Sequence, residues 1–194
     1  TKDPKGVINT QKMICANQQQ ILQCFPVLGE TPPVLVDWLP WNHTFGGNHN
    51  VGIALYNGGT LYIDEGKPTP KGIAATLSNL REIAPTVYLA APRSWDNMLT
   101  SIRVRMEAST PLKKRVFDHF IDVGVAVERL KLDGKTPTAM QRVQCRLGEI
   151  LVFGPLKDQF GLNRMRVALT GGEAMGEDTF LFYRALGINL RQLY

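Results

Sequence analysis

The chain has 194 residues, of which 44% are hydrophobic and 20% charged, which is typical of a globular protein with a sizeable core. It contains no run of about 18 apolar residues, so we expect no transmembrane helix. The net charge of +5 comes without a basic block interleaved with aromatic residues, which argues against nucleic-acid binding, and the three cysteines lack the spacing of metal ligands.

Apolar runs alternate with longer amphipathic runs along the chain, which indicates an α/β protein. In chain order we predict a helix over 8–24, a strand over 34–39, a helix over 45–57, a strand over 60–63, a helix over 70–83, a strand over 86–90, helices over 94–107, 110–132 and 136–153, a strand over 166–169, a helix over 177–186 and a strand over 188–193. Because helices separate the strands, we predict a mostly parallel sheet flanked by helices.

Several residues indicate where these helices begin and end. Ser94 is the predicted N-cap of the helix over 94–107. Thr110-Pro111 and Thr136-Pro137 mark the starts of the next two helices, and Pro70 lies near the first turn of an earlier one. Gly187 is expected to close the last helix.

Three segments have residue types suited to a binding site. The chain opens with Thr1 and Pro4-Lys5-Gly6, a pattern that taken alone also fits a surface turn. The strand that ends near Pro40 is followed by Trp41, His43 and a glycine-rich stretch. Histidines in such loops often cap backbone groups, and this interpretation remains open for His43 and for His49.

The third segment is Leu169-Thr170-Gly171-Gly172-Glu173, in which a strand runs into paired glycines before a helix. Without a Cβ, such a turn lets a flat ring approach the backbone. The spacing of Gly171, Gly172 and Gly176 departs from Gly-x-Gly-x-x-Gly, and no ribose-binding acid follows at the expected distance. A nucleotide-dependent oxidoreductase is therefore a poor alternative.

In this order and separation, and with Tyr194 following Leu190-Arg191-Gln192-Leu193, the segments resemble the adenylate-forming (AMP-binding) enzymes. The resemblance covers almost the whole chain. It implies an acyl-CoA synthetase that uses ATP, Mg²⁺ and coenzyme A to activate a carboxylic acid through acyl-AMP. We therefore expect residues 1–194 to be an internal fragment of the AMP-binding N-terminal domain, without the C-terminal lid domain and inactive on its own.

The resemblance also implies roles for individual residues. His43 falls on the histidine near the bound carboxylate and the coenzyme A tunnel and is the expected catalytic residue. The expected acyl and coenzyme A pocket comprises Phe45, Gly46, Asn48 and His49. The expected nucleotide-binding residues are Thr1, Lys5, Gly171, Gly172, Glu173, Gln192 and Tyr194, while the Mg²⁺ ligand and the catalytic lysine lie outside the chain.

The sequences of residues 37–48 and 56–64 resemble those of feruloyl-CoA synthetases more than those of other branches of the family. That resemblance implies a hydroxycinnamate substrate and a cytoplasmic role in aromatic-acid catabolism. Activation of fatty or other acids is an alternative, as is a non-catalytic globular fragment with weak nucleotide affinity. Expected partners are the acid, ATP, coenzyme A and the missing remainder of the chain, with a homo-oligomer also possible.

Overall fold

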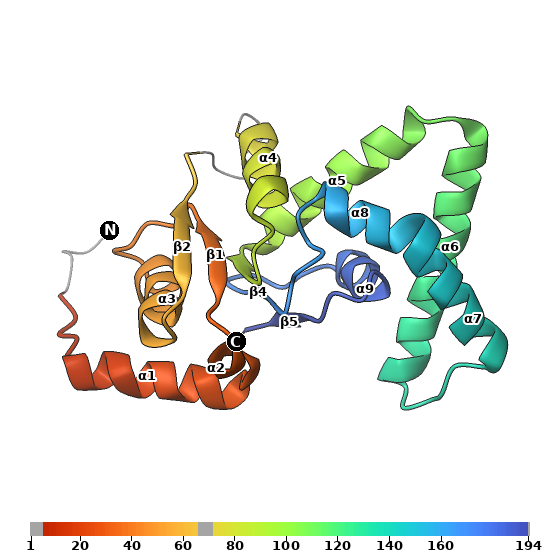
Figure 1. The fold of residues 1–194 in the computed structure, drawn as a ribbon. Coiled ribbons are helices and arrows are strands. Elements are labelled where there is room, and N and C mark those ends of the chain that lie inside the picture. Colours follow the sequence, from red (N-terminus) through yellow and green to blue (C-terminus); the bar gives the residue numbers. More distant parts are fainter. Residues whose placement is uncertain (1–5, 66–71, 194) are drawn as a thin grey trace.

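The structure is a computed structural model that describes residues 6–65 and 72–193. Within these residues, parallel strands form one sheet in the order β2-β1-β3-β4-β5 (Figure 1). The strands are β1 (Val34–Asp37), β2 (Thr60–Ile63), β3 (Val87–Ala90), β4 (Val167–Thr170) and β5 (Leu190–Gln192). The predicted α/β class, with a parallel sheet flanked by helices, is confirmed.

Helices connect the strands and cover both faces of the sheet. The α-helices are α1 (Gln11–Cys24), α2 (Val27–Glu30), α3 (Gly52–Tyr56), α4 (Ile73–Ile83), α5 (Pro92–Glu107), α6 (Pro111–Leu132), α7 (Ala139–Gly148), α8 (Gly154–Gln159) and α9 (Glu177–Ala185). Two π-helical segments, η1 (Thr44–Val51) and η2 (Glu149–Phe153), run directly into α3 and α8.

Alternation along the strands divides the apolar residues into two cores. In β3, Val87 and Leu89 belong to one core, whereas Tyr88 and Ala90 belong to the other. The first core packs under α1, α2 and α3, and the second, larger core packs under α4, α5, α6, α8 and α9. Figure 1 shows α6 and α7 beyond α9, on the side away from β2.

Two predicted helix starts are wrong. The structure places Ser94 inside the first turn of α5, buried, while Ala91 is the N-cap and Pro92 the first helical residue. The helix predicted over 136–153 begins at Ala139, because the Thr138 hydroxyl accepts from the Gln141 N–H in a capping box. The same stretch changes to π-helix at Glu149.

Other predicted boundaries agree or differ by a turn. Thr110 caps α6 as predicted, and Gly187 closes α9 with a positive φ of 81°. The strand predicted over 34–39 ends at Asp37, and the short helix α2 was not predicted. Pro70 lies outside the described residues.

Candidate functional site

A cleft opens at the carboxyl ends of β1, β3 and β4. The chain leaves β1 toward β2 but leaves β3 toward β4, so neighbouring strands send their connections in opposite directions. Ligands of open α/β sheets bind at such a switch point. The cleft has a volume of about 630 Å³ and is lined by Leu39, Pro40, His43, Phe45, Ala91, Pro92, Arg93, Asp96, Gly171, Gly172, Glu173 and Ala174.

Buried Asp37 organises the loop that follows β1. One carboxylate oxygen accepts from the Leu39 N–H at 3.1 Å and from Asn50 Nδ2 at 2.7 Å, and the other accepts from Trp41 Nε1 at 2.7 Å. Asn50 lies in η1, so a single side chain ties the strand end, the loop and the π-helix together. The sequence interpretation did not select Asp37 as a site residue, because the sequence does not show that the Trp41 and Asn50 side chains fold back onto it.

The His43 side chain caps η1 and lines the cleft. Its Nδ1 accepts from the Phe45 N–H at 3.2 Å, so the capping interpretation of His43 is confirmed. When Nδ1 accepts, the neutral ring carries its proton on Nε2. The cap therefore leaves His43 with an N–H donor on the ring edge that the backbone does not use.

Phe45 separates His43 from His49 on the same segment. Its ring meets each histidine ring edge-on, with centroids 5.5 Å apart in both pairs. His49 Nδ1 lies 3.3 Å from the Thr44 carbonyl oxygen. Burial lowers the pKa of His49, and the hydrogen bond to Thr44 opposes that shift only in part, which favours the neutral imidazole.

Two glycines let η1 pack against the loop before it. A Cβ on Gly46 would lie 2.4 Å from the Pro40 carbonyl oxygen, and one on Gly47 would lie 2.3 Å from that of Trp41. Gly46 is buried and does not line the cleft. Gly46 therefore affects the cleft indirectly, because its close packing positions the η1 segment that presents Phe45.

The loop after β4 forms the opposite wall. A Cβ on Gly171 would lie 3.0 Å from Phe45 Cζ, so the two walls touch at this point. Gly172 has a φ of +94°, and nothing lies within 4 Å of the Cβ position. Gln192 Nε2 donates to the Glu173 carbonyl oxygen and its Oε1 accepts from the Met175 N–H, both at 3.4 Å.

The structure thus brings His43, Phe45, Gly171, Gly172 and Glu173 together around one cleft. His49 and Gly46 lie behind Phe45, and Gln192 contacts the rim from β5. The other three predicted nucleotide-binding residues, Thr1, Lys5 and Tyr194, are outside the described residues.

Two further cleft residues come from the start of α5. Arg93 is exposed and has no ion-pair partner among the described side chains, while Asp96 accepts from the Thr179 hydroxyl at 2.6 Å. Sequence reasoning missed both. The available signal was their position directly after a predicted strand, where parallel sheets place binding residues.

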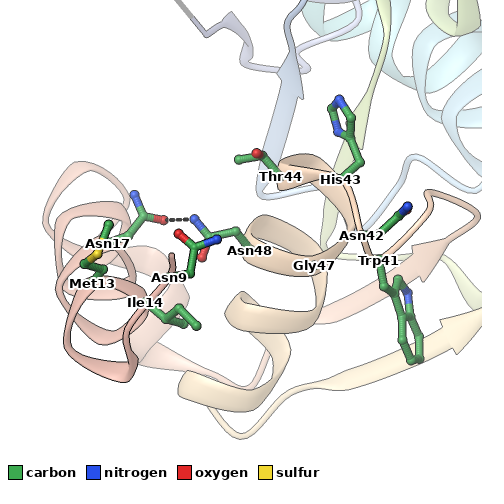
Figure 2. Close-up of a pocket in the computed structure, with 10 residues that line it drawn as sticks. All are labelled: Asn9, Met13, Ile14, Asn17, Trp41, Asn42, His43, Thr44, Gly47 and Asn48. Atoms are coloured by element: carbon green, nitrogen blue, oxygen red, sulfur yellow. Dashed lines mark hydrogen bonds between the residues drawn. The ribbon is translucent and has the colours of Figure 1, made fainter. Parts of the chain in front are cut away.

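Asn48 faces a second cavity, a groove of about 520 Å³ between α1 and η1 (Figure 2). Its side chain donates through Nδ2 to Asn17 Oδ1 at 2.8 Å. His43 lines both cavities, so the two meet at one residue. The groove is lined by Asn9, Met13, Ile14, Asn17, Trp41, Asn42, His43, Thr44, Gly47 and Asn48.

Two further observations describe the chemistry available around the cleft. The open approach at Gly172 leaves room for a flat ring beside the backbone. Among residues 6–65 and 72–193, no three His, Cys, Asp or Glu side chains gather in a way that could hold a metal. None of the helices described is both long and apolar enough to cross a membrane.

Comparison with known proteins identifies related chains. The model of the AMP-binding enzyme family matches residues 1–194. Long-chain-fatty-acid–CoA ligase ACSBG2 of Homo sapiens is 26% identical over 98% of this chain and 28% of its own length. The putative fatty-acid–CoA ligase fadD11 of Mycobacterium tuberculosis is 24% identical over 63% of this chain and 21% of its own.

A peroxisomal relative, long chain acyl-CoA synthetase 7 of Arabidopsis thaliana, is 23% identical over 100% of this chain and 25% of its own length. No solved structure matches the chain. The chain spans about a quarter of the length of these curated relatives. With a family model that matches from the first residue to the last, the chain belongs to the AMP-binding enzyme family.

Proposed function

We propose that this chain is an internal part of the N-terminal domain of an AMP-forming acid–thiol ligase, an acyl-CoA synthetase. In the proposed reaction, a carboxylate oxygen attacks the α-phosphate of ATP, which gives acyl-AMP and releases pyrophosphate. The thiol of coenzyme A then attacks the acyl carbon and displaces AMP. The observation that carries the proposal is the cleft at the switch point, lined by both His43 and the Gly171-Gly172 turn.

In this proposal, each wall of the cleft has its own task. The turn at Gly172 receives the adenine, with Tyr194 and Gln192 beside it, and Thr1 and Lys5 contact phosphate. His43 is proposed to lie where the carboxylate and the thiol meet, because its cap leaves a ring N–H unused by the backbone. Phe45 and His49, which is kept neutral by burial, form the acyl side.

For the acid, we propose a hydroxycinnamate such as ferulate, with a fatty acid as the second candidate. The sequence of residues 37–48 and 56–64 supports the aromatic acid, whereas the names of the relatives, which are fatty-acid–CoA ligases, support the fatty acid. Mg²⁺ is proposed to accompany ATP with a protein ligand outside this chain. A cytoplasmic location and a homo-oligomer remain part of the same proposal.

Acid-dependent ATP–pyrophosphate exchange by the full-length protein tests the proposed function. We expect exchange with an acid from a panel that includes ferulate, cinnamate and palmitate, and none from residues 1–194 alone. The His43→Ala variant should lose acid- and coenzyme A-dependent rate while its affinity for ATP stays near that of the wild type. Full-length protein without exchange for any acid would refute the proposal.

A further inference from the structure

An exposed apolar stripe runs along α7 and the π-helical turn η2 that follows it. Its members lie three or four residues from their neighbours in the stripe, so they share one face of the helix. Between 48% and 71% of each residue is exposed, and the members are Met140, Val143, Leu147, Ile150 and Leu151. Single exposed apolar residues are normal on a protein surface, but a continuous patch of them marks an interaction site.

The stripe is not the face by which this segment packs on the rest of the protein. Gly148, Val152 and Phe153 are buried, and a Cβ on Gly148 would lie 3.0 Å from the Phe120 ring of α6. A surface helix usually has polar residues opposite its buried face. Here the solvent side is apolar as well, so the segment has a second apolar face that none of the described elements covers.

Basic side chains lie beside the stripe. Arg142 and Arg146 are one helical turn apart and exposed, and neither has an ion-pair partner among the described side chains. The sequence of α7 contains no acidic residue, and Glu149 in η2 pairs with Lys157 at 2.8 Å. The surface next to the stripe is therefore cationic and complements an anionic partner.

The position of α7 favours a flat partner. Figure 1 shows this helix at the edge of the molecule, on the side away from β2. From Met140 to Leu151 the stripe is about 16 Å long at about 1.5 Å per residue, and its residues line neither the cleft nor the groove between α1 and η1. A protruding helix with an apolar face and arginines beside it is typical of helices that lie in the interface of a lipid bilayer, whereas a helix that binds another protein is usually received in a groove.

We propose that the stripe on α7 and η2 docks the protein on an anionic lipid surface. The apolar side chains enter the interface of the bilayer, and Arg142 and Arg146 bind headgroup phosphates. A guanidinium group matches phosphate geometry with paired N–H donors, and its long apolar stem can lie along lipid tails. The inference goes beyond the proposed function, because it concerns a face apart from the cleft and does not depend on the identity of the acid.

Co-sedimentation of the full-length protein with lipid vesicles tests the inference. We expect binding to phosphatidylcholine vesicles that contain phosphatidylserine, and weaker binding to phosphatidylcholine alone or at high salt. The double variant Leu147→Ser, Ile150→Ser should reduce the partition coefficient at least tenfold, because two apolar side chains no longer enter the bilayer. The matched control is Val104→Ser, Leu112→Ser, which changes two comparably exposed apolar residues outside the stripe and should bind as the wild type does.

A second pair of variants tests the charge. Arg142→Gln, Arg146→Gln should weaken binding to the phosphatidylserine vesicles at least tenfold and should have little effect with phosphatidylcholine alone. Lys113→Gln, Arg115→Gln removes the same charge from exposed positions of α6 and should leave binding near that of the wild type. Because all four positions carry solvated charges, these variants keep the test informative even if the serine pair fails to fold.

Four results would overturn the inference. The first is a full-length protein that binds neither kind of vesicle. The second is an equal loss of binding in a control pair, which would assign the contact to another face or to net charge. The third is a serine pair that lowers the melting temperature but not vesicle binding, which would show that the remainder of the chain covers the stripe. The fourth is a serine pair that converts a dimer to a monomer in light scattering with vesicle binding unchanged, which would show that a second copy covers it.

The vesicle experiment is also separable from the test of the proposed function. It uses neither ATP nor an acid, so a protein without pyrophosphate exchange can still bind vesicles through the stripe. Conversely, a protein that exchanges pyrophosphate but binds no vesicle refutes the lipid surface and leaves the proposed function standing.

Discussion

The two walls of the cleft differ in how extensively the protein's own hydrogen bonds and packing contacts hold them in place. The wall after β1 is internally bonded: Asp37 holds both ends of its loop, and Gly46 and Gly47 pack against the carbonyl groups of Pro40 and Trp41. The wall after β4 is more open, since Gly172 has nothing within 4 Å of its Cβ position and the Gln192 side chain contacts the rim through 3.4 Å hydrogen bonds.

This difference separates two requirements of a binding site. A preorganised wall fixes the catalytic side chain before the substrate arrives. An open turn leaves room for the ligand to complete its own contacts. Substitutions in the β1 wall should therefore reduce stability, whereas substitutions in the β4 wall should mainly reduce ligand affinity.

The largest expected effect is that of Asp37→Ala. The change leaves the Leu39 N–H, Trp41 Nε1 and Asn50 Nδ2 without their acceptor, and each loss costs about 1–3 kcal/mol. We expect a loss of about 4 kcal/mol in the free energy of unfolding, measured by urea denaturation. Asp118→Ala, at an exposed position, is the control and should stay within about 0.5 kcal/mol of the wild type.

A smaller loss of stability is expected for Gly46→Ala. The added methyl group collides with a backbone oxygen that cannot rotate away, so η1 must shift. We expect about 3 kcal/mol of destabilisation in the same denaturation experiment. Gly176→Ala is a matched control, because nothing lies within 4 Å of its Cβ position and its φ is −61°; equal effects at the two glycines would contradict the comparison.

Gly172→Val should sharpen the comparison from the other wall. A branched side chain at a φ of +94° is strained by about 2 kcal/mol, yet no described atom lies within 4 Å of its Cβ position. We expect the full-length variant to fold and to lose affinity for a non-hydrolysable acyl-AMP analogue in calorimetric titration. Normal affinity together with a lower melting temperature would show that the glycine serves packing alone.

The smallest expected effect concerns the protonation of His49. Its pKa is lowered in the folded state, so as the pH falls through about 6.5 the unfolded chain binds more protons than the folded protein. Stability therefore decreases as the pH is lowered. We expect the melting temperature of the wild type to drop more between pH 7 and pH 5 than that of His49→Gln. Parallel pH profiles for the two proteins would remove His49 as the cause.

The elements that sequence predicted best are those defined by local signals. The strand at 60–63 follows a glycine turn and has the predicted bounds, and the Thr110 cap and Gly187 terminus depend only on neighbouring residues. The helix predicted over 136–153 failed where tertiary packing intervenes. A Cβ on Gly148 would lie 3.0 Å from the Phe120 ring of α6, and the chain becomes π-helical directly after Gly148.

The candidate site divides in the same way. His43, Phe45 and the glycine pair were found because each stands in a recognisable run of residues. Asp37 and Arg93 were missed because their importance depends on partners and walls contributed by other segments. Whether the predicted residues bind nucleotide and acid stays a prediction that the experiments above test.

The pairing of β3 with β4 has a consequence for how the molecule folds. These strands are neighbours in the sheet, but the long helical excursion α5 through α8 separates Ala90 from Val167 in the chain. Closing so long a loop carries an entropic cost that must be met before its contacts form. We therefore expect β1, η1, α3 and β2 to form early during folding, and the wall that carries Gly172 to join them only in a late step.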